Sequence, residues 1–309
     1  WFNVEDLKKQ TYINQIIEML NKTIEIYKNV PDCDFIYNRR DFPLIRKDNY
    51  ESFSNLYNEP KIIDENLKPK NIWPLCSQSK TKYHLDIVIP NSDDWDGLKK
   101  DKIYINVEWK DKLETLFWRG SSTGCSTNII DNPRLYFCNL DNKLNYNKYN
   151  KEEKLIDLKI TKLTNKLKVN KSIISKLNIH KIPYNVNSKH FFINSENYSK
   201  YKYLLNIEGN VSAYRLGHLF ATNSLIINVK SDYYVWFEPL LKLNTNYINI
   251  ERNIYSNELK NKILYLKKND DYVKTISENG YNFYKKYINI NTICKYWYYL
   301  LISINNLQI

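Results

Sequence analysis

The stretch YKYLLNIEGNVSAYRLGHLFATNSLIINV, residues 201–229, decides the fold class of this chain. Its apolar run at 203–207 has the length of a buried strand, and Glu-Gly-Asn at 208–210 supplies a turn. Residues 224–229 form a second short, β-branched strand. Between the strands, apolar residues recur at helical spacing, and Ser212 is in place to cap that helix. The pattern predicts a βαβ unit of an α/β protein.

A βαβ unit points a helix N-terminus, with free N–H groups and partial positive charge, at the end of the sheet, where phosphates commonly bind. Arg215, predicted in the first helical turn, adds a planar donor fork suited to phosphate oxygens. The alternative is an ordinary βαβ unit with a solvated Arg215. This stretch by itself slightly favours that alternative.

The use of arginine and glycine moves the interpretation toward an anion site. Only seven of the 46 Lys and Arg residues are Arg, and the chain of 309 residues has six Gly. Four of these Gly and three of these Arg fall within 119–134 or 209–217. Arg supplies a forked pair of hydrogen-bond donors, and Gly allows a ligand to approach the backbone closely.

Composition narrows the class of protein. A chain of 309 residues holds one large domain or two moderate ones, and a hydrophobic content of 43% excludes wholesale disorder. No apolar run reaches the length of a membrane span. The chain begins at Trp1 without Met, as a processed or excised segment does. The net charge of +12 raises nucleic acid as a partner, but the lysines are dispersed and no nucleic-acid-binding motif is present.

The cysteines and histidines argue against a metal site. The five Cys are scattered and odd in number, no CxxC pair occurs and the four His are isolated, which favours a mostly reduced protein without zinc. Asp32-Cys33-Asp34 matches a DxD metal motif superficially. Because it precedes an apolar strand instead of following one, we expect a loop and no metal.

Two further turns carry polar groups directly after predicted strands. The strand at 35–37 leads into the turn 38–43, which places Asp41 where α/β enzymes hold catalytic carboxylates. A lone turn Asp more often bonds its own backbone. The strand at 116–118 leads into Arg-Gly-Ser-Ser-Thr-Gly at 119–124, a nest of N–H and O–H donors that is not a Walker loop.

The other elements follow from periodicity and composition. Asn-Pro-Arg-Leu at 132–135 opens a helix with Arg134 in its first turn. Further helices are expected over 5–29, 256–268, 270–288 and 293–304, and further strands over 85–90, 103–107 and 246–250. Polar or Lys/Asn-rich sequence predicts loops over 91–102 and exposed loop or frayed helix over 139–172.

Three ordered motifs resemble those of glycosyltransferase family 90, the CAP10/Rumi group of protein O-glucosyltransferases and fungal capsule xylosyltransferases. They are Asn-x-Arg-Asp-x-Pro at 38–43, Trp-Arg-Gly-Ser-x-Thr at 118–123, and Lys-Tyr-x-Leu-Asn-x-x-Gly…Ser-x-x-Arg-x-x-x-Leu at 202–219. The match runs from about Asp32 to Trp297. Abundant Lys, Asn, Ile and Tyr suggest an AT-rich genome, such as that of a giant virus or a protist.

The resemblance implies a GT-B fold of two Rossmann-like domains facing a central cleft, with the C-terminal helix packing back toward the N-terminal domain. The expected domains are 1–112 on the acceptor side with the catalytic base, 113–288 for the nucleotide sugar, and 289–309 for the returning helix. The implied reaction is inverting and metal-independent transfer of a sugar, glucose or xylose, from a UDP-sugar to a hydroxyl acceptor on a protein or glycan. A basic nucleic-acid-binding protein without transferase activity is the alternative.

The resemblance also assigns roles residue by residue. Asp41 matches the general base that takes the proton of the acceptor hydroxyl. Arg215 would meet the charge on the departing UDP oxygen, as a metal-free site requires. The donor-binding positions are Arg119, Gly120, Ser121, Thr123, Gly209, Ser212, Ala213 and Arg215. Trp73 and Glu238 are candidates for acceptor or sugar contacts.

The chain departs from the family at three points. Animal O-glucosyltransferases carry a second Arg where this chain has Thr127-Asn128, which leaves Arg134 as the candidate substitute in donor binding. They carry Tyr where this chain has Glu238. Cysteines are sparser than in luminal members, which favours a reduced cytoplasmic location, that of an infected host cell for a viral protein, over the ER lumen. No cofactor or nucleic-acid partner is expected.

Overall fold

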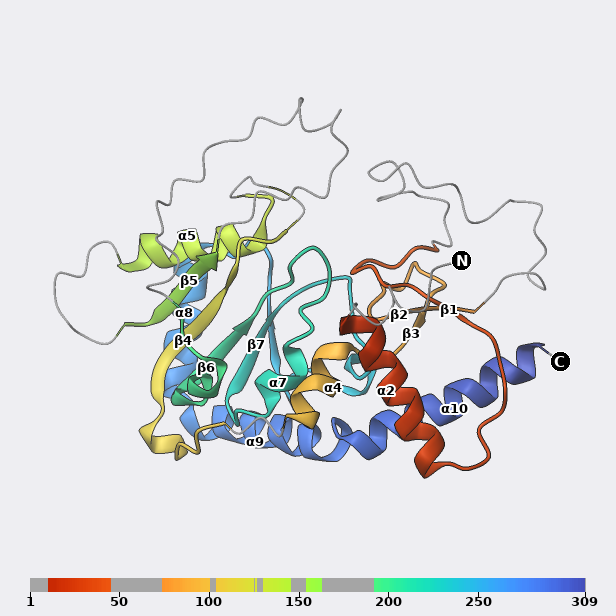
Figure 1. The fold of residues 1–309 in the computed structure, drawn as a ribbon. Coiled ribbons are helices and arrows are strands. Elements are labelled where there is room, and N and C mark those ends of the chain that lie inside the picture. Colours follow the sequence, from red (N-terminus) through yellow and green to blue (C-terminus); the bar gives the residue numbers. More distant parts are fainter. Residues whose placement is uncertain are drawn as a thin grey trace, which may run out of the picture. The chain divides into compact units, whose positions relative to one another are not determined.

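The computed structural model describes residues 11–45, 74–100, 104–124, 126, 130–145, 154–162 and 192–308. It is a mixed α/β structure with two parallel sheets (Figure 1). The chain divides into two compact units. Unit 1 comprises Trp1–Lys102, Asp232–Pro239 and Lys286–Ile309, and unit 2 comprises Ile103–Ser231 and Leu240–Lys285.

Unit 1 is built on a small parallel sheet. Its strands, in spatial order, are β1 (Ile36–Tyr37), β2 (Leu75–Ser77) and β3 (Ile87–Val88), and its helices are α2 (Thr11–Ile26), α4 (Ser92–Lys99) and α10 (Ile290–Gln308). Helices α2 and α10, near opposite ends of the sequence, lie side by side (Figure 1). The ring of Tyr27, just beyond α2, stacks on that of Tyr298 at 4.4 Å, and Trp297 Nε1 lies 3.3 Å from Met19 Sδ.

Helix α4 corrects the loop predicted over 91–102. Asn91 caps it, because the Asn91 Oδ1 atom accepts the backbone N–H of Asp94 at 2.8 Å. Trp95 is 3% exposed and anchors the helix in the core. The run Asn-Ser-Asp-Asp is a recognisable helix start, but its polar composition is also typical of a loop.

The prediction of a strand over 103–107 is wrong, because residues 104–107 form no strand.

Unit 2 is built on a larger parallel sheet. Its strands, in spatial order, are β5 (Ile156–Lys162), β4 (Leu113–Ser121), β6 (Tyr201–Asn206), β7 (Leu225–Val229) and β8 (Ile248–Ile250). Its helices are α5 (Pro133–Asn145), α7 (Leu216–Phe220), α8 (Ser256–Lys268) and most of α9 (Asp270–Tyr287). Figure 1 shows α5 and α8 beside β4 and β5. Short 3₁₀ turns are η2 (Trp109–Asp111), η4 (Ser195–Lys200) and η5 (Glu238–Leu240), the last straddling the unit boundary.

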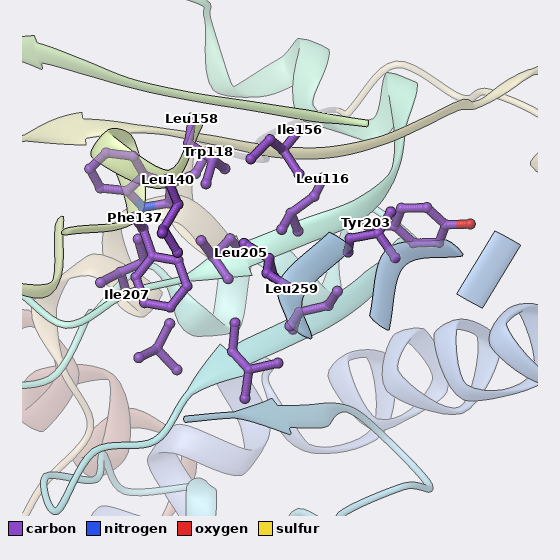
Figure 2. Packing of buried hydrophobic residues seen from close by; sticks show 14 of the residues in the cluster. Leu116, Trp118, Phe137, Leu140, Ile156, Leu158, Tyr203, Leu205, Ile207 and Leu259 are labelled. Carbon is purple, nitrogen blue, oxygen red and sulfur yellow. The ribbon is translucent and has the colours of Figure 1, made fainter. Parts of the chain in front are cut away.

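One face of the larger sheet forms the main core of unit 2 (Figure 2). Leu116 and Trp118 of β4 point into it, and Phe137 of α5 and Leu259 of α8 pack against them. Successive side chains of a strand alternate between faces. The position of Gly120, two residues after Trp118, therefore belongs to the same face as the Trp118 ring, and Arg119 belongs to the opposite face.

Strand β5 corrects the prediction of loop or frayed helix over 139–172. Ile156, Leu158 and Ile160 are buried in the core, whereas Asp157 and Lys159 alternate with them on the other face. This period of two is the normal signal of a strand. Surrounding Lys and Asn residues obscured it in the sequence.

Helix α7 corrects the start of the helix predicted after Ser212. The helix begins at Leu216, and Arg215 is its N-cap instead of lying in its first turn. Leu216 N donates to Ala213 O at 3.0 Å, which closes the preceding turn. The guanidinium of Arg215 is therefore carried by a turn at the carboxyl side of β6.

The other helices and strands discussed below are of the predicted type, with some differences in where they begin and end. Helix α8 has the predicted bounds, α9 ends one residue earlier, and α10 extends beyond 293–304 at both ends. The strands expected at 35–37, 85–90, 116–118, 203–207, 224–229 and 246–250 correspond to β1, β3, β4, β6, β7 and β8. Within the described ranges, no helix has the length and hydropathy needed to cross a bilayer.

Lys112, just before β4, leads to a prediction about pH and stability. Its side chain is 4% exposed, and Nζ donates to Thr222 O at 2.9 Å and to Ser224 Oγ at 3.0 Å. Burial lowers the pKa of Lys112 to about 7. Between about pH 7 and about pH 10.4, the pKa of an unfolded lysine, the unfolded chain binds one more proton than the folded chain. The free energy of unfolding should therefore rise with pH by about 1 kcal/mol per unit.

We expect Lys112→Met to equal or exceed the wild type in stability near pH 6 and to be less stable than it near pH 9, measured by urea denaturation. Lys110→Met, at an exposed position two residues away, is the control and should show no such change of sign. Wild-type and Lys112→Met stabilities that stay parallel across this range would contradict the argument from burial.

Candidate functional site

Arg134 joins the two turns that follow β4 and β6. The first turn carries Ser121 and Thr123, and the second carries Glu208 and Gly209. Arg134 donates from Nη1 to Ser121 O at 3.1 Å and to Thr123 Oγ1, and from Nε to Glu208 O at 2.9 Å. A single side chain therefore sets the spacing of both turns.

The N-terminus of α5 presents Arg134 to these turns. Asn132 Oδ1 accepts the N–H of Arg134 at 3.0 Å, and Asn132 Nδ2 donates to Ser122 O at 3.0 Å. Pro133 occupies the first helical position, where its missing N–H costs nothing. The helix start predicted at 132–135 is confirmed, with Arg134 in the first turn.

The ring of Trp118 is the platform on which two guanidinium groups lie. Its centroid is 5.7 Å from Arg134 Cζ and 5.5 Å from Arg215 Cζ, both within cation–π range. Arg215 is fixed further by donation from Nη1 to Arg119 O at 2.6 Å. Two cations held this close repel each other. The arrangement therefore favours a bound anion.

Arg134 carries a buried positive charge. It is 8% exposed, and its hydrogen-bond acceptors among the described residues are carbonyl and hydroxyl oxygens. Burial and then the nearby charge of Arg215 lower the pKa of Arg134 from 12.5 to about 9, so that it is still cationic at neutral pH. A buried cation that bonds to neutral groups is unfavourable by itself. An anionic ligand would offset this cost.

At two of the candidate glycines, Gly120 and Gly209, other groups approach the backbone closely. A Cβ atom on Gly120 would lie 2.5 Å from Trp118 Cζ2 and 2.9 Å from Arg215 Nη2. A Cβ atom on Gly209 would lie 3.0 Å from Arg134 Nη2. Among the described residues no glycine has positive φ, so space and not backbone conformation selects these two.

The Arg119 side chain bonds to β5. Its Nη2 pairs with Asp157 Oδ2 at 2.7 Å, its Nη1 donates to Asp157 O at 2.8 Å, and its Cζ lies 4.4 Å from the ring centroid of Phe117. These contacts tie β4 to β5. Arg119 contacts another candidate residue through its carbonyl oxygen, which accepts a hydrogen bond from Arg215.

The candidate hydroxyl groups lie on the same turns. Ser121 Oγ and Thr123 Oγ1 are 3.2 Å apart. Ser212 Oγ is buried and has no hydrogen-bond partner among the described residues. Ala213 is 8% exposed and helps close the turn before α7. Ser212 thus keeps an unused donor in the turn that leads to α7.

In unit 1, Asp41 is half-buried in the loop after β1. Asn38 Oδ1 accepts the N–H of Arg40 at 3.0 Å, and Asn38 Nδ2 donates to Phe42 O at 2.7 Å. Ser79 Oγ donates to Asp41 O at 3.2 Å. The predicted turn is confirmed, and Asn38 supplies bonds from a side chain to its backbone.

The other candidate positions have separate surroundings. Glu238, in unit 1, accepts the N–H of Val235 at its Oε2 atom, at 2.7 Å, and so closes a turn. Residues 32–34 form an irregular loop before β1, as expected for the DxD-like sequence. Trp73 and Thr127-Asn128 lie outside the described residues.

The described part of the chain contains no group of three or more His, Cys, Asp or Glu side chains arranged to hold a metal ion. Its free thiols are Cys33, Cys76, Cys138 and Cys294.

Four contributors were not predicted from the sequence as parts of this site. Trp118 could have been found, because it lies two residues before Gly120 and so on the same strand face. Asn132 is a recognisable cap. Asp157 is on a strand that was not predicted. Glu208, which pairs with Arg252 at 2.7 Å, lay in the predicted turn but had no predicted partner.

Unit 2 belongs to the class of parallel α/β folds whose candidate ligand site lies at the carboxyl ends of the strands, where such sheets commonly bind ligands. The chain belongs to glycosyl transferase family 90, because the sequence model described as Glycosyl transferase family 90 matches residues 7–309. The predicted family is therefore confirmed.

Named relatives come from viruses and animals. Uncharacterized protein 179R of Invertebrate iridescent virus 6 is 29% identical over 90% of this chain and 27% of its own length. Protein O-glucosyltransferase 1 of Homo sapiens is 25% identical over 90% of this chain and 63% of its own length. The chain therefore spans about a quarter of that viral relative. Among solved structures, the GtfA/B complex aligns with 63% of this chain and 39% of its own at TM-score 0.36 and 13% identity.

The space around Gly120 gives a testable prediction. Gly120→Ala would push a Cβ atom into the Trp118 ring, and overpacking of this kind destabilises by about 1–3 kcal/mol. Trp118→Phe removes the clashing ring atoms at the cost of a cavity. In a double-mutant cycle followed by urea denaturation, we expect the two changes to offset each other in part. Strictly additive effects would show that the alanine methyl group does not meet the indole.

Proposed function

We propose that this chain is a glycosyltransferase that moves a sugar from a UDP-sugar to a hydroxyl acceptor on a protein or glycan. Its membership of glycosyl transferase family 90 supports transfer chemistry. The observation that carries the proposal is the pair of guanidinium groups, Arg134 and Arg215, held on Trp118 at the turns after β4 and β6. Such a pair is suited to a diphosphate, which presents two adjacent anionic groups.

The donor would bind at the unit 2 turns. Arg215 would stabilise the negative charge that develops on the leaving UDP oxygen, a task that falls to arginines and backbone N–H groups when no metal takes part. Ser212 Oγ and the hydroxyls of Ser121 and Thr123 would donate to phosphate oxygens. Arg134 would act mainly by holding the two turns at the spacing that the diphosphate needs.

Asp41 would act as the general base. A carboxylate beside the acceptor hydroxyl removes its proton as that oxygen attacks the anomeric carbon, and direct attack inverts the configuration there. Asp41 lies in the loop that follows β1. Loops that follow the carboxyl ends of parallel strands are where such sheets commonly present catalytic groups. In the GT-B arrangement implied by the resemblance, units 1 and 2 would supply the base and the donor site, respectively.

The human relative named above supports a protein acceptor and glucose as the sugar. Protein O-glucosyltransferase 1 is named for glucose transfer to protein, and xylose is the second sugar of this proposal. The net charge of +12 alone would suit a nucleic-acid-binding protein, but the family match gives that alternative no support.

Arg215 should govern nucleotide affinity. We expect Arg215→Ala to weaken UDP binding, measured by calorimetry, by about 1.5–3 kcal/mol, the usual contribution of a charged hydrogen bond. This corresponds to roughly a 10- to 150-fold rise in Kd. Arg215→Lys should recover part of the loss, because it keeps the charge but not the fork. Arg39→Ala, at an exposed position of unit 1, is the control. Unchanged UDP affinity in Arg215→Ala would remove this residue from the donor site.

Asp41 should govern turnover. With UDP-glucose or UDP-xylose as donor, Asp41→Asn should lower the rate of UDP release by about 10²- to 10⁴-fold, the usual contribution of a general base. UDP affinity should be unchanged, and wild-type turnover should be the same in EDTA. Asp34→Asn, an exposed aspartate before β1, is the matched control. Normal turnover by folded Asp41→Asn would exclude the proposed base.

A further inference from the structure

The loop after β1, residues 38–45, is bonded to the body of unit 1 at both of its ends and in its middle. Its start is bound by Asn38 N, which donates to Cys76 O at 2.8 Å. Its end is bound by Leu85 N, which donates to Ile45 O at 2.7 Å. Asp41 lies between these points, and its own carbonyl accepts from Ser79. The loop backbone is therefore held on both sides of Asp41.

Asp86 makes the strongest of these attachments. Its Oδ1 accepts the N–H of Leu44 at 2.8 Å, and its Oδ2 accepts the N–H of Ile45 at 2.8 Å. Hydrogen bonds to an ionised carboxylate are stronger than those between neutral groups. Asp86 is 1% exposed, so water competes little for these bonds. Both oxygens thus grip the segment that leaves Asp41.

The same carboxylate is linked to the segment that precedes Asp41. Ser77 Oγ donates to Asp86 Oδ1 at 2.7 Å, and Asn38 Nδ2 donates to Ser77 Oγ at 2.9 Å. Asn38 in turn holds Arg40 N and Phe42 O. A continuous buried chain of hydrogen bonds therefore runs from Asp86 to the residues on either side of Asp41.

We propose that Asp86 is a positioning residue for the reaction: through Ser77 and Asn38 on one side and the N–H groups of Leu44 and Ile45 on the other, it fixes the backbone that carries Asp41. This inference rests on the proposed role of Asp41 as general base. Asp86 does not itself meet the substrate in this scheme, because both of its oxygens are occupied by the loop and by Ser77.

Replacement of Asp86 by asparagine tests the clamp with little change of volume. One of the two side-chain oxygens becomes an NH₂ group, which cannot accept a peptide N–H. Either Leu44 or Ile45 then loses its bond, and the loop can shift. A displacement of about 1 Å at a catalytic group can lower the rate by about 10²-fold.

The experiment compares wild type, Asp86→Asn and Ser77→Ala with UDP-glucose as donor. For Asp86→Asn we expect kcat for UDP release to fall by about 10²-fold while KM for UDP-glucose is unchanged, because the proposed donor contacts are in unit 2. Ser77→Ala, which keeps the carboxylate, should show a smaller fall in kcat and keeps the test open if Asp86→Asn does not fold. Hydrogen exchange at the Leu44 and Ile45 amides should quicken in Asp86→Asn.

Asp141→Asn is the matched control. Asp141 is another fully buried aspartate, bonded to Lys159 in unit 2, so its replacement should lower Tm without changing kcat per folded molecule. Wild-type kcat in the folded variants, or an equal fall in Asp141→Asn, would overturn the inference. If wild type does not turn over UDP-glucose, the proposed function fails on this probe. Hydrogen exchange at the Leu44 and Ile45 amides then tests whether Asp86 holds the loop. Unchanged protection of these amides in Asp86→Asn would overturn the inference.

Discussion

The structure of the candidate donor site depends on one buried charge, the guanidinium of Arg134. It spans the turns after β4 and β6 and bonds to their carbonyl and hydroxyl oxygens. Because those partners are neutral, they fix its position without cancelling its charge. Arg215, on the same indole, adds a second cation, and a bound anion would relieve the repulsion between the two. Stability of the turns and the proposed affinity for a diphosphate would therefore arise from the same contacts.

Unit 1 uses the opposite charge in a similar way. Asp86 is buried and accepts backbone N–H groups of the loop that carries Asp41. In both units a buried ionic side chain outside regular strand pairing holds an irregular segment in one conformation. Loops alone pay a large entropy cost for order. A charged group with several backbone partners offsets that cost and would hold the proposed catalytic side chain in one position.

Two differences between expectation and structure have a common cause. Strand β5 and helix α4 lie in stretches whose Lys, Asn and Asp content is typical of loops. Strand β5 forms because every second side chain is buried against the core, and α4 forms because Asn91 caps it and residues such as Trp95 are buried. Tertiary contacts of this kind outweigh local propensity. Helix α7 differs for a local reason: it begins later than its apolar spacing suggests, because a turn closed by Leu216 N and Ala213 O precedes it.

The amino-acid sequence by itself determined the α/β class, most of the strands and helices, the family, and the residue types at the candidate site, because these depend on periodicity and on short motifs. Only the tertiary structure decided which atoms meet. It turned the Arg119 side chain to Asp157, on a strand 38 residues away in the sequence, and it brought Arg134 to the β6 turn. It also revealed Trp118 as the shared platform and Asp86 as the clamp. Such contacts join segments distant in the chain, and no local pattern encodes their partners.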